Sequence, residues 1–213
     1  MGIIVPRVAR CVINGKTPQP GWLPHRWLTV VAADVDTGAG AGAIWLVGHP
    51  RSTKAETYTA LIERCGGQWQ YIGGASSSGG DVPADRSAAG QPGQIGLIEL
   101  QEGASVRSYA YRQQHPRFIS TAPWIGSSEL QVASGVSHLL VGERRIEVPR
   151  HGRLIVAWKS PPTGNRGLRP LIVAFEPNGS ELSRIGPHDR MDSYTWAKFG
   201  GQQDTKNFQI RRG

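Results

Sequence analysis

The tripeptide His-Pro-Arg occurs twice, as His49-Pro50-Arg51 and as His115-Pro116-Arg117, in a chain that has only 6 histidines. Imidazole can accept or release a proton near neutral pH, and guanidinium can hold a carboxylate or a phosphate. Two copies at one mouth of the fold would therefore form a cationic cluster. Proline removes a backbone donor and ends regular structure, so we interpret both copies as the ends of strands.

Asp34 and Asp36 are the candidates for carboxylate chemistry. They alternate along one expected strand, so their side chains leave the same face about 7 Å apart. Two carboxylates can divide acid and base roles when their surroundings separate their pKa values. With His49 and His115 they form the candidate catalytic set. The stronger interpretation is structural, because Asp beside a Gly-rich loop is a common turn former.

Other motifs are weak. The stretch GAGAGA at 38–43 fits a loose dinucleotide-binding pattern, but IWLVGHP follows, where that motif requires a helix. His188, Asp189 and Asp192 have no recognised metal-ligand spacing and are predicted to lie in a solvated loop. Neither a metal nor a cofactor is expected.

Basic residues are the clearest chemical feature. The formal net charge is +8 and the pI is about 10.0, which favours anionic partners. Residues 144–169 hold seven positive side chains against Glu147 alone, with Trp158 among them. Strand alternation places Trp158 with Leu154 and Val156, so Trp158 is expected in the core. The candidate ligand-binding residues are Arg51, Arg117, Arg144, Arg145, Arg150, Arg153, Arg166 and Arg169.

The elements that position these residues are predicted to be strands. Gly and Pro number 28 and 15 of 213 residues, which favours short strands joined by turns. Residues 52–66 fit either a helix capped by Thr53 or a hairpin with Gly66-Gly67 as its turn, and the hairpin is favoured. Further turns are expected at Gly142-Glu143 and Pro177–Gly179. Strands are expected over 26–36, 44–50, 95–101, 105–113, 117–121, 128–134, 136–149, 153–160 and 169–185.

The fold class is therefore all-β, an antiparallel β-sandwich or barrel with an immunoglobulin-like pattern in the C-terminal half and little helix. The Cys…Trp…Cys spacing of true immunoglobulin domains is absent, and two cysteines exclude a disulfide scaffold. Residues 73–94 are rich in Gly, Ser and Pro and predict a flexible loop or linker. This segment separates an N-terminal β-rich part, 1–72, from a β-sandwich part, 95–200. A basic tail, 201–213, follows the sandwich part.

Three functional hypotheses follow. The favoured one is a non-catalytic binding module that engages an anionic ligand or an acidic protein surface through a basic face or end loops. The second is an enzyme with a His/Asp/Arg site, and the third is nucleic-acid binding through residues 144–169. The chain start lacks a signal-peptide pattern and no window predicts a membrane span, so a cytoplasmic protein is expected. A trimmed extracellular domain would have the same sequence features.

Overall fold

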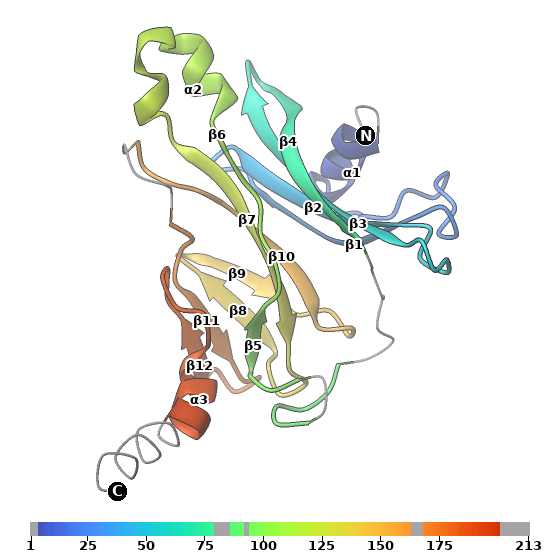
Figure 1. The fold of residues 1–213 in the computed structure, drawn as a ribbon, viewed down its shortest axis with the longest axis vertical. Coiled ribbons are helices and arrows are strands. Elements are labelled where there is room, and N and C mark those ends of the chain that lie inside the picture. Colours follow the sequence, from blue (N-terminus) through green and yellow to red (C-terminus); the bar gives the residue numbers. More distant parts are fainter. Residues whose placement is uncertain (1–3, 79–85, 92–93, 163–167, 201–213) are drawn as a thin grey trace, which may run out of the picture. The chain divides into compact units, whose positions relative to one another are not determined.

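A computed structural model describes residues 4–78, 86–91, 94–162 and 168–200, and it confirms the predicted all-β class with antiparallel sheets (Figure 1). The chain forms two compact units, each made of three segments. Unit 1 comprises Met1–Ala84, Gln101–Glu129 and Arg153–Arg169, and unit 2 comprises Asp85–Leu100, Leu130–Gly152 and Pro170–Gly213. Each unit thus combines segments that are far apart in the sequence, in contrast to the linear order of parts expected above. The immunoglobulin-like arrangement stays a prediction, and the basic tail lies outside the described residues.

Unit 1 is organised around a four-stranded antiparallel sheet of order β1-β2-β3-β4. Gly66 and Gly67 have φ values of 56° and 82°, as a primed hairpin turn requires, so the hairpin prediction is confirmed. Residues 73–78 differ from the expected flexible segment because they continue the last strand, while 79–85 and 92–93 lie outside the described residues. The strands are β1 (Leu28–Asp36), β2 (Ala41–Gly48), β3 (Glu56–Cys65) and β4 (Gln68–Ser78).

An N-terminal helix, α1 (Ile4–Ile13), covers one face of this sheet and was not predicted. Its Val5, Val8 and Ala9 are fully buried because their spacing of three and four places them on one side of the helix. They pack against a cluster that includes Ile44 of β2. The proline in its first turn is tolerated because the first N–H groups have no partner within a helix.

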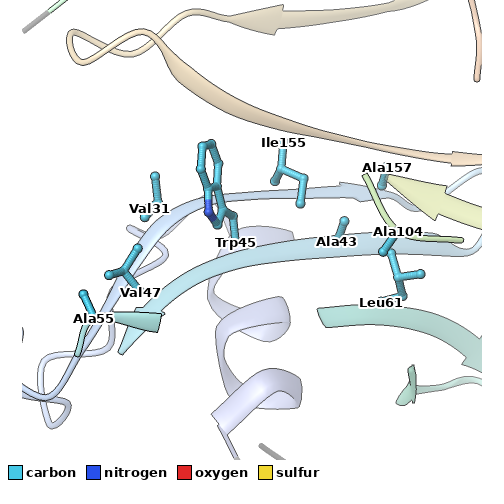
Figure 2. Packing of buried hydrophobic residues seen from close by; sticks show 9 residues of the cluster. All are labelled: Val31, Ala43, Trp45, Val47, Ala55, Leu61, Ala104, Ile155 and Ala157. Atoms are coloured by element: carbon cyan, nitrogen blue, oxygen red, sulfur yellow. The ribbon is translucent and has the colours of Figure 1, made fainter. Parts of the chain in front are cut away.

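The opposite face of the sheet is covered by β10 (Arg153–Lys159), which packs across β1 and β2 (Figure 2). Ile155 of β10 and Trp45 of β2 belong to one buried cluster. The guanidinium of Arg153 lies 5.4 Å from the Trp45 ring centroid, so this arginine is directed at the sheet. Because β2 has apolar layers on both sides, every one of its residues is buried.

Trp158 is a core residue, as the alternation of β10 predicts, and it is 8% exposed. It faces β7 (Trp124–Val132) at Gly126. A Cβ at position 126 would lie only 2.1 Å from the Trp158 ring, so only glycine fits there. Trp158 is therefore not a stacking platform for a nucleic-acid base.

The two strands predicted over 105–113 and 117–121 are wrong for most of their length. A short strand, β6 (Ser105–Arg107), pairs with β7 and is followed by α2 (Tyr109–Gln114) and the 3₁₀ helix η1 (Pro116–Thr121). Ser108 caps α2 by accepting the N–H of Tyr111 at 3.0 Å. A capping serine followed by Ala, Arg and Gln favours a helix more strongly than the aromatic alternation favours a strand.

Unit 2 contains an antiparallel sheet of order β12-β11-β8-β9, and a further sheet has the order β10-β7-β5 with β6 paired to β7. The turns predicted at Gly142-Glu143 and Pro177–Gly179 both join neighbouring strands of this sheet and are confirmed. No helix in the described part of the chain is long and apolar enough to span a membrane. The elements are β5 (Ile98–Leu100), which pairs with the end of β7, then β8 (His138–Val141), β9 (Arg144–Glu147), β11 (Ile172–Phe175), β12 (Glu181–Ile185), α3 (Ser193–Thr195) and the π-helical turn η2 (Trp196–Gly200).

A buried carboxylate in unit 1 gives a pH-dependence prediction. Glu129 of β7 is 2% exposed and accepts a hydrogen bond from the Thr59 hydroxyl. Burial raises the pKa of Glu129, and the nearby charge of Glu102 adds to this effect. The folded pKa therefore lies above the unfolded value of about 4.3, and the stability contributed by this site falls as pH rises between the two values.

We expect Glu129→Gln to be more stable than the wild type above the folded pKa, because the amide carries no charge to desolvate and can still accept the Thr59 hydrogen bond. Urea unfolding across the acidic-to-neutral range should show a smaller decline of stability with pH in the variant. Glu143→Gln, at an exposed turn residue, is the matched control and should retain the wild-type pH profile. An unchanged profile in Glu129→Gln would contradict the assignment.

Candidate functional site

The two His-Pro-Arg copies lie at opposite ends of the central sheet of unit 1. His49 follows Gly48, which pairs with Glu56 at the start of β3. His115 ends α2, whose first turn is bonded to Glu63 near the end of β3. Glu56 and Glu63 are seven positions apart, roughly 23 Å along a strand, so the copies do not form one cationic mouth. The first copy ends a strand as predicted, whereas the second ends a helix.

Asp34 and Asp36 both bind backbone groups. Asp36 accepts the N–H of Ala39 at 2.9 Å and closes the turn between β1 and β2, as the structural interpretation expects. Asp34 accepts the N–H of Ala157 at 2.8 Å and so ties β1 to β10. His49 is separated from Asp36 by the whole length of β2. The structure therefore does not assemble Asp34, Asp36, His49 and His115 into one site.

The basic run 144–169 is divided between the two units. In unit 2, Arg144 and Arg145 belong to β9, Arg145 pairs with Glu147 at 2.6 Å, and Arg150 is exposed. In unit 1, Arg153 stacks on Trp45, Lys159 pairs with buried Glu63 and Arg169 is half-buried. Arg166 lies outside the described residues. The described residues of the run therefore do not form a single exposed face in either unit.

The exposed feature that contains one predicted pair, His115 and Arg117, is the segment between β6 and β7. We call residues 108–123 the α2–η1 loop. It begins at the end of β6 and ends at the start of β7, where Arg107 pairs with Trp124. The N–H of Ser108 donates to the carbonyl of Pro123 at 2.7 Å. Neither α2 nor η1 contains a buried residue, and both lie beyond the ends of β6 and β7 (Figure 1).

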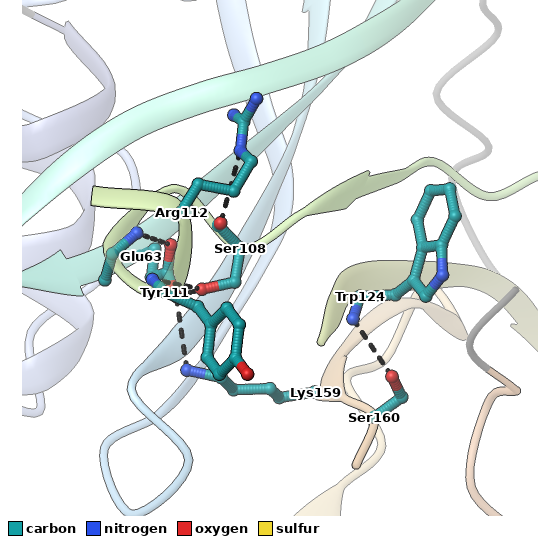
Figure 3. Close-up of polar contacts among 8 residues, drawn as sticks. Glu63, Ser108, Tyr111, Arg112, Trp124, Lys159 and Ser160 are labelled. Carbon is teal, nitrogen blue, oxygen red and sulfur yellow. Dashed lines mark hydrogen bonds and ion pairs between the residues drawn. The ribbon is translucent and has the colours of Figure 1, made fainter. Parts of the chain in front are cut away.

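A fully buried glutamate holds the base of this loop (Figure 3). One carboxylate oxygen of Glu63 accepts hydrogen bonds from the Ser108 hydroxyl at 2.5 Å and from the Lys159 ammonium at 3.1 Å. The other oxygen accepts the N–H of Ala110 at 3.0 Å. Glu63 thus binds the capping residue of α2, a free N–H in its first turn and a cation on β10.

Burying the Glu63 carboxylate costs free energy that its partners must offset. A buried carboxylate loses several kcal/mol of hydration, and only a close cation and well-placed donors offset that loss. Here both are supplied, and the donors come from the start of α2. Glu63 therefore holds the start of the loop, and α2 and η1 contribute no buried residue of their own. At the other end of the loop, Ala122 is fully buried. We infer that the outward residues of the loop can be exchanged with little effect on the fold.

The outward residues of the loop are cationic and apolar. The Arg112 guanidinium lies 5.9 Å from the Tyr109 ring centroid, and the rings of Tyr111 and His115 are 4.6 Å apart. The neighbouring apolar residues Phe118 and Ile119 are 59% and 50% exposed. Residues 103–123 contain no Asp or Glu. The loop thus presents an apolar tip beside Arg112, His115 and Arg117 without an acidic neighbour in its own sequence.

Sequence reasoning found His115 and Arg117 but missed Glu63, Ser108 and the exposed pair Phe118-Ile119. The capping signal at Ser108 was present in the sequence, because Ser precedes several good helix formers. Glu63 gave no such signal, since its partner Ser108 is 45 positions away.

Two observations concern metal ligation and the Cys65 thiol. No group of three or more His, Cys, Asp and Glu side chains among them is placed to hold a metal ion. Burial raises the pKa of the Cys65 thiol, and the charge of Glu63 adds to this, so the reactive thiolate is disfavoured. Comparisons with protein-family models, curated proteins and solved structures find no match. The function must be inferred from the loop itself.

Proposed function

We propose that the protein is a non-catalytic binding module whose α2–η1 loop engages an acidic surface of a partner protein. The carrying observation is that this loop exposes Phe118 and Ile119 beside Arg112 and Arg117 with no acid of its own, while buried Glu63 holds its base.

Each part of the loop has a role in such an interface. Arginine and aromatic side chains account for a large share of binding energy in protein interfaces, and apolar contacts at the centre exclude water. The cations Arg112 and Arg117 speed association with an acidic surface and select against basic ones. A base fixed before binding reduces the entropy lost on association.

A protein partner is favoured over a nucleic acid or a membrane. Single-stranded nucleic acid binds along a basic groove with a series of stacked aromatics, whereas the tip has Phe118 followed by the aliphatic Ile119. Stable attachment to an anionic membrane needs a larger apolar face or a lipid anchor. A compact apolar tip with flanking arginines matches the size of a hot spot in a protein interface.

The test uses an acidic peptide of alternating Glu and Leu as the probe, with binding followed by fluorescence anisotropy. We expect Arg117→Ala and Phe118→Ala each to weaken binding about tenfold, which corresponds to about 1.4 kcal/mol. Arg51→Ala is the matched control because it removes the same charge from the same tripeptide at the other end of the sheet. It should change the affinity by less than about twofold.

Three outcomes would overturn the proposal. Equal losses in Arg51→Ala and Arg117→Ala would show that only net charge matters. The absence of saturable peptide binding would remove the proposed function. Binding to phosphatidylserine vesicles or to single-stranded DNA in place of the peptide would show that the partner is a membrane or a nucleic acid.

A further inference from the structure

Unit 2 contains a pocket of about 500 Å³, and all the residues that line it lie in the segment 184–196. This volume lies within the range of small-molecule sites, about 300–1,000 Å³. Its lining includes His188, Arg190, Met191 and Trp196. Met191 and Trp196 are 48% and 63% exposed, so their apolar surfaces are open to a ligand. The pocket residues belong to unit 2, whereas the α2–η1 loop belongs to unit 1.

The wall that carries Trp196 is held by a second buried carboxylate. Asp192 is fully buried and accepts the N–H groups of Leu97 at 2.9 Å and Ile98 at 2.8 Å. It also caps α3 by accepting the N–H of Thr195 at 2.9 Å. The solvated loop predicted for this residue is therefore wrong at Asp192. Trp196 directly follows α3, and the start of α3 is held at Leu97 and Ile98 by Asp192.

Two charged residues of the lining are already engaged. Arg184 makes a bidentate pair with Glu181, with nitrogen to oxygen distances of 2.6 and 2.7 Å. Asp189 accepts the N–H of Gly186 at 2.8 Å. The pair with Glu181 compensates the charge of Arg184.

His188 and Arg190 differ from these residues. Neither has a hydrogen bond or an ion pair with another residue in the part of the chain that the structure describes. A guanidinium such as that of Arg190 is a planar cation whose N–H groups match the oxygens of a phosphate or carboxylate. The pocket thus combines a cation available to a ligand with an indole and a thioether.

We propose that this pocket binds a small planar aromatic anion of nucleotide size. The ring stacks on Trp196 beside Met191, and the anionic group bonds to Arg190, with His188 as a further donor. An indole face accepts any flat aromatic ring, while arginine requires the negative group. Tight binding needs both the aromatic ring and the anionic group, because Trp196 contacts only the ring and Arg190 contacts only the anionic group.

The test is an isothermal titration of the full chain with adenosine monophosphate, compared with adenosine and with inorganic phosphate. We expect saturable binding of the nucleotide and at least about tenfold weaker binding of either half. Trp196→Ala and Arg190→Ala should each weaken nucleotide binding about tenfold or more. Trp22→Ala is the matched control, because Trp22 is an exposed tryptophan of unit 1 with the Arg7 guanidinium over its ring.

Non-saturable nucleotide binding would overturn the proposal, as would unchanged affinity in Trp196→Ala. Equal affinity for adenosine and the nucleotide would show that the anionic group is not recognised, which also contradicts it. Circular dichroism melting confirms that each variant folds, which is expected because Trp196 is largely exposed. The acidic-peptide experiment on the α2–η1 loop reports on unit 1, so failure of either proposal is distinguishable from failure of the other.

Discussion

Glu63→Ala is expected to lower the free energy of unfolding by about 3–5 kcal/mol, the range found when one partner of a buried ion pair is removed. The substitution leaves the Ser108 hydroxyl and the Ala110 N–H without their acceptor and Lys159 without its counterion. The Lys159 side chain is 28% exposed and can be rehydrated in part, which places the loss toward the lower end of that range. Urea unfolding monitored by circular dichroism gives the value.

Further variants separate the contributions of the cap, the hydrogen bonds and the ion pair to this loss of stability. Ser108→Ala removes the cap and one hydrogen bond, and should cost about 1–2 kcal/mol. Glu63→Gln keeps an acceptor for α2 but not the ion pair, so its effect should fall between those of Ser108→Ala and Glu63→Ala. If Lys159→Met and Glu63→Ala together cost as much as their separate effects added, the pair is not coupled, contrary to the structure.

Glu63→Ala should also weaken binding of the acidic peptide under conditions where the protein remains folded. The outward residues of the loop are unchanged in this variant, so any loss must come from release of the base of α2. Undiminished peptide affinity would show that the position of the loop does not matter for binding.

The hairpins of this fold were predictable because their signals are local. Gly66-Gly67 supplies the positive φ values that a primed turn needs, and Pro177–Gly179 combines residues that each favour a turn. Alternation along β10 placed Trp158 in the core for the same reason, since neighbouring residues point to opposite faces.

The helices were not predictable from local signals because they depend on distant contacts. A helix shorter than about 12–15 residues is marginal without tertiary support. For α2 that support comes from Glu63, and for α3 it comes from Leu97 and Ile98. These partners lie 45 to 95 positions away along the chain, so no local window contains both sides of the interaction.

The candidate site was predicted in part. The His-Pro-Arg repeat identified Arg117 and the basic run identified Arg153 as candidate ligand-binding residues, although Arg117 is exposed on a loop and Arg153 lies against Trp45. Charge density along a sequence does not distinguish a cation that faces solvent from one that covers an aromatic ring. The same limit applies to carboxylates, since Asp36 closes an exposed turn while Glu63 and Asp192 are fully buried.

In both units a buried carboxylate fixes the position of a short helix. A buried carboxylate accepts backbone N–H groups at the start of a short helix, and exposed aromatic residues follow that start. In unit 1 the pair is Glu63 and α2, and in unit 2 it is Asp192 and α3. Carboxylates suit this role because each oxygen accepts more than one hydrogen bond and favours the positive end of the helix.

Asp192→Ala is expected to lower the free energy of unfolding by about 3–5 kcal/mol, because three buried N–H groups would lose their acceptor and each unsatisfied group costs about 1–3 kcal/mol before water enters. Hydrogen exchange measured by NMR offers a direct readout. The amides of Leu97, Ile98 and Thr195 should lose protection in the variant, while the amides of the α1-covered sheet in unit 1 should keep theirs.

Asp189→Ala is the matched control for Asp192→Ala, since it removes an aspartate from the same loop. Asp189 is exposed, so its loss should change stability by less than about 1 kcal/mol. Asp192→Asn retains one acceptor oxygen and should fall between the two alanine variants. Retained protection of Leu97 and Ile98 in Asp192→Ala would show that other groups hold α3 against β5. In that case Trp196 would owe its position to the rest of unit 2, and nucleotide binding should survive the substitution.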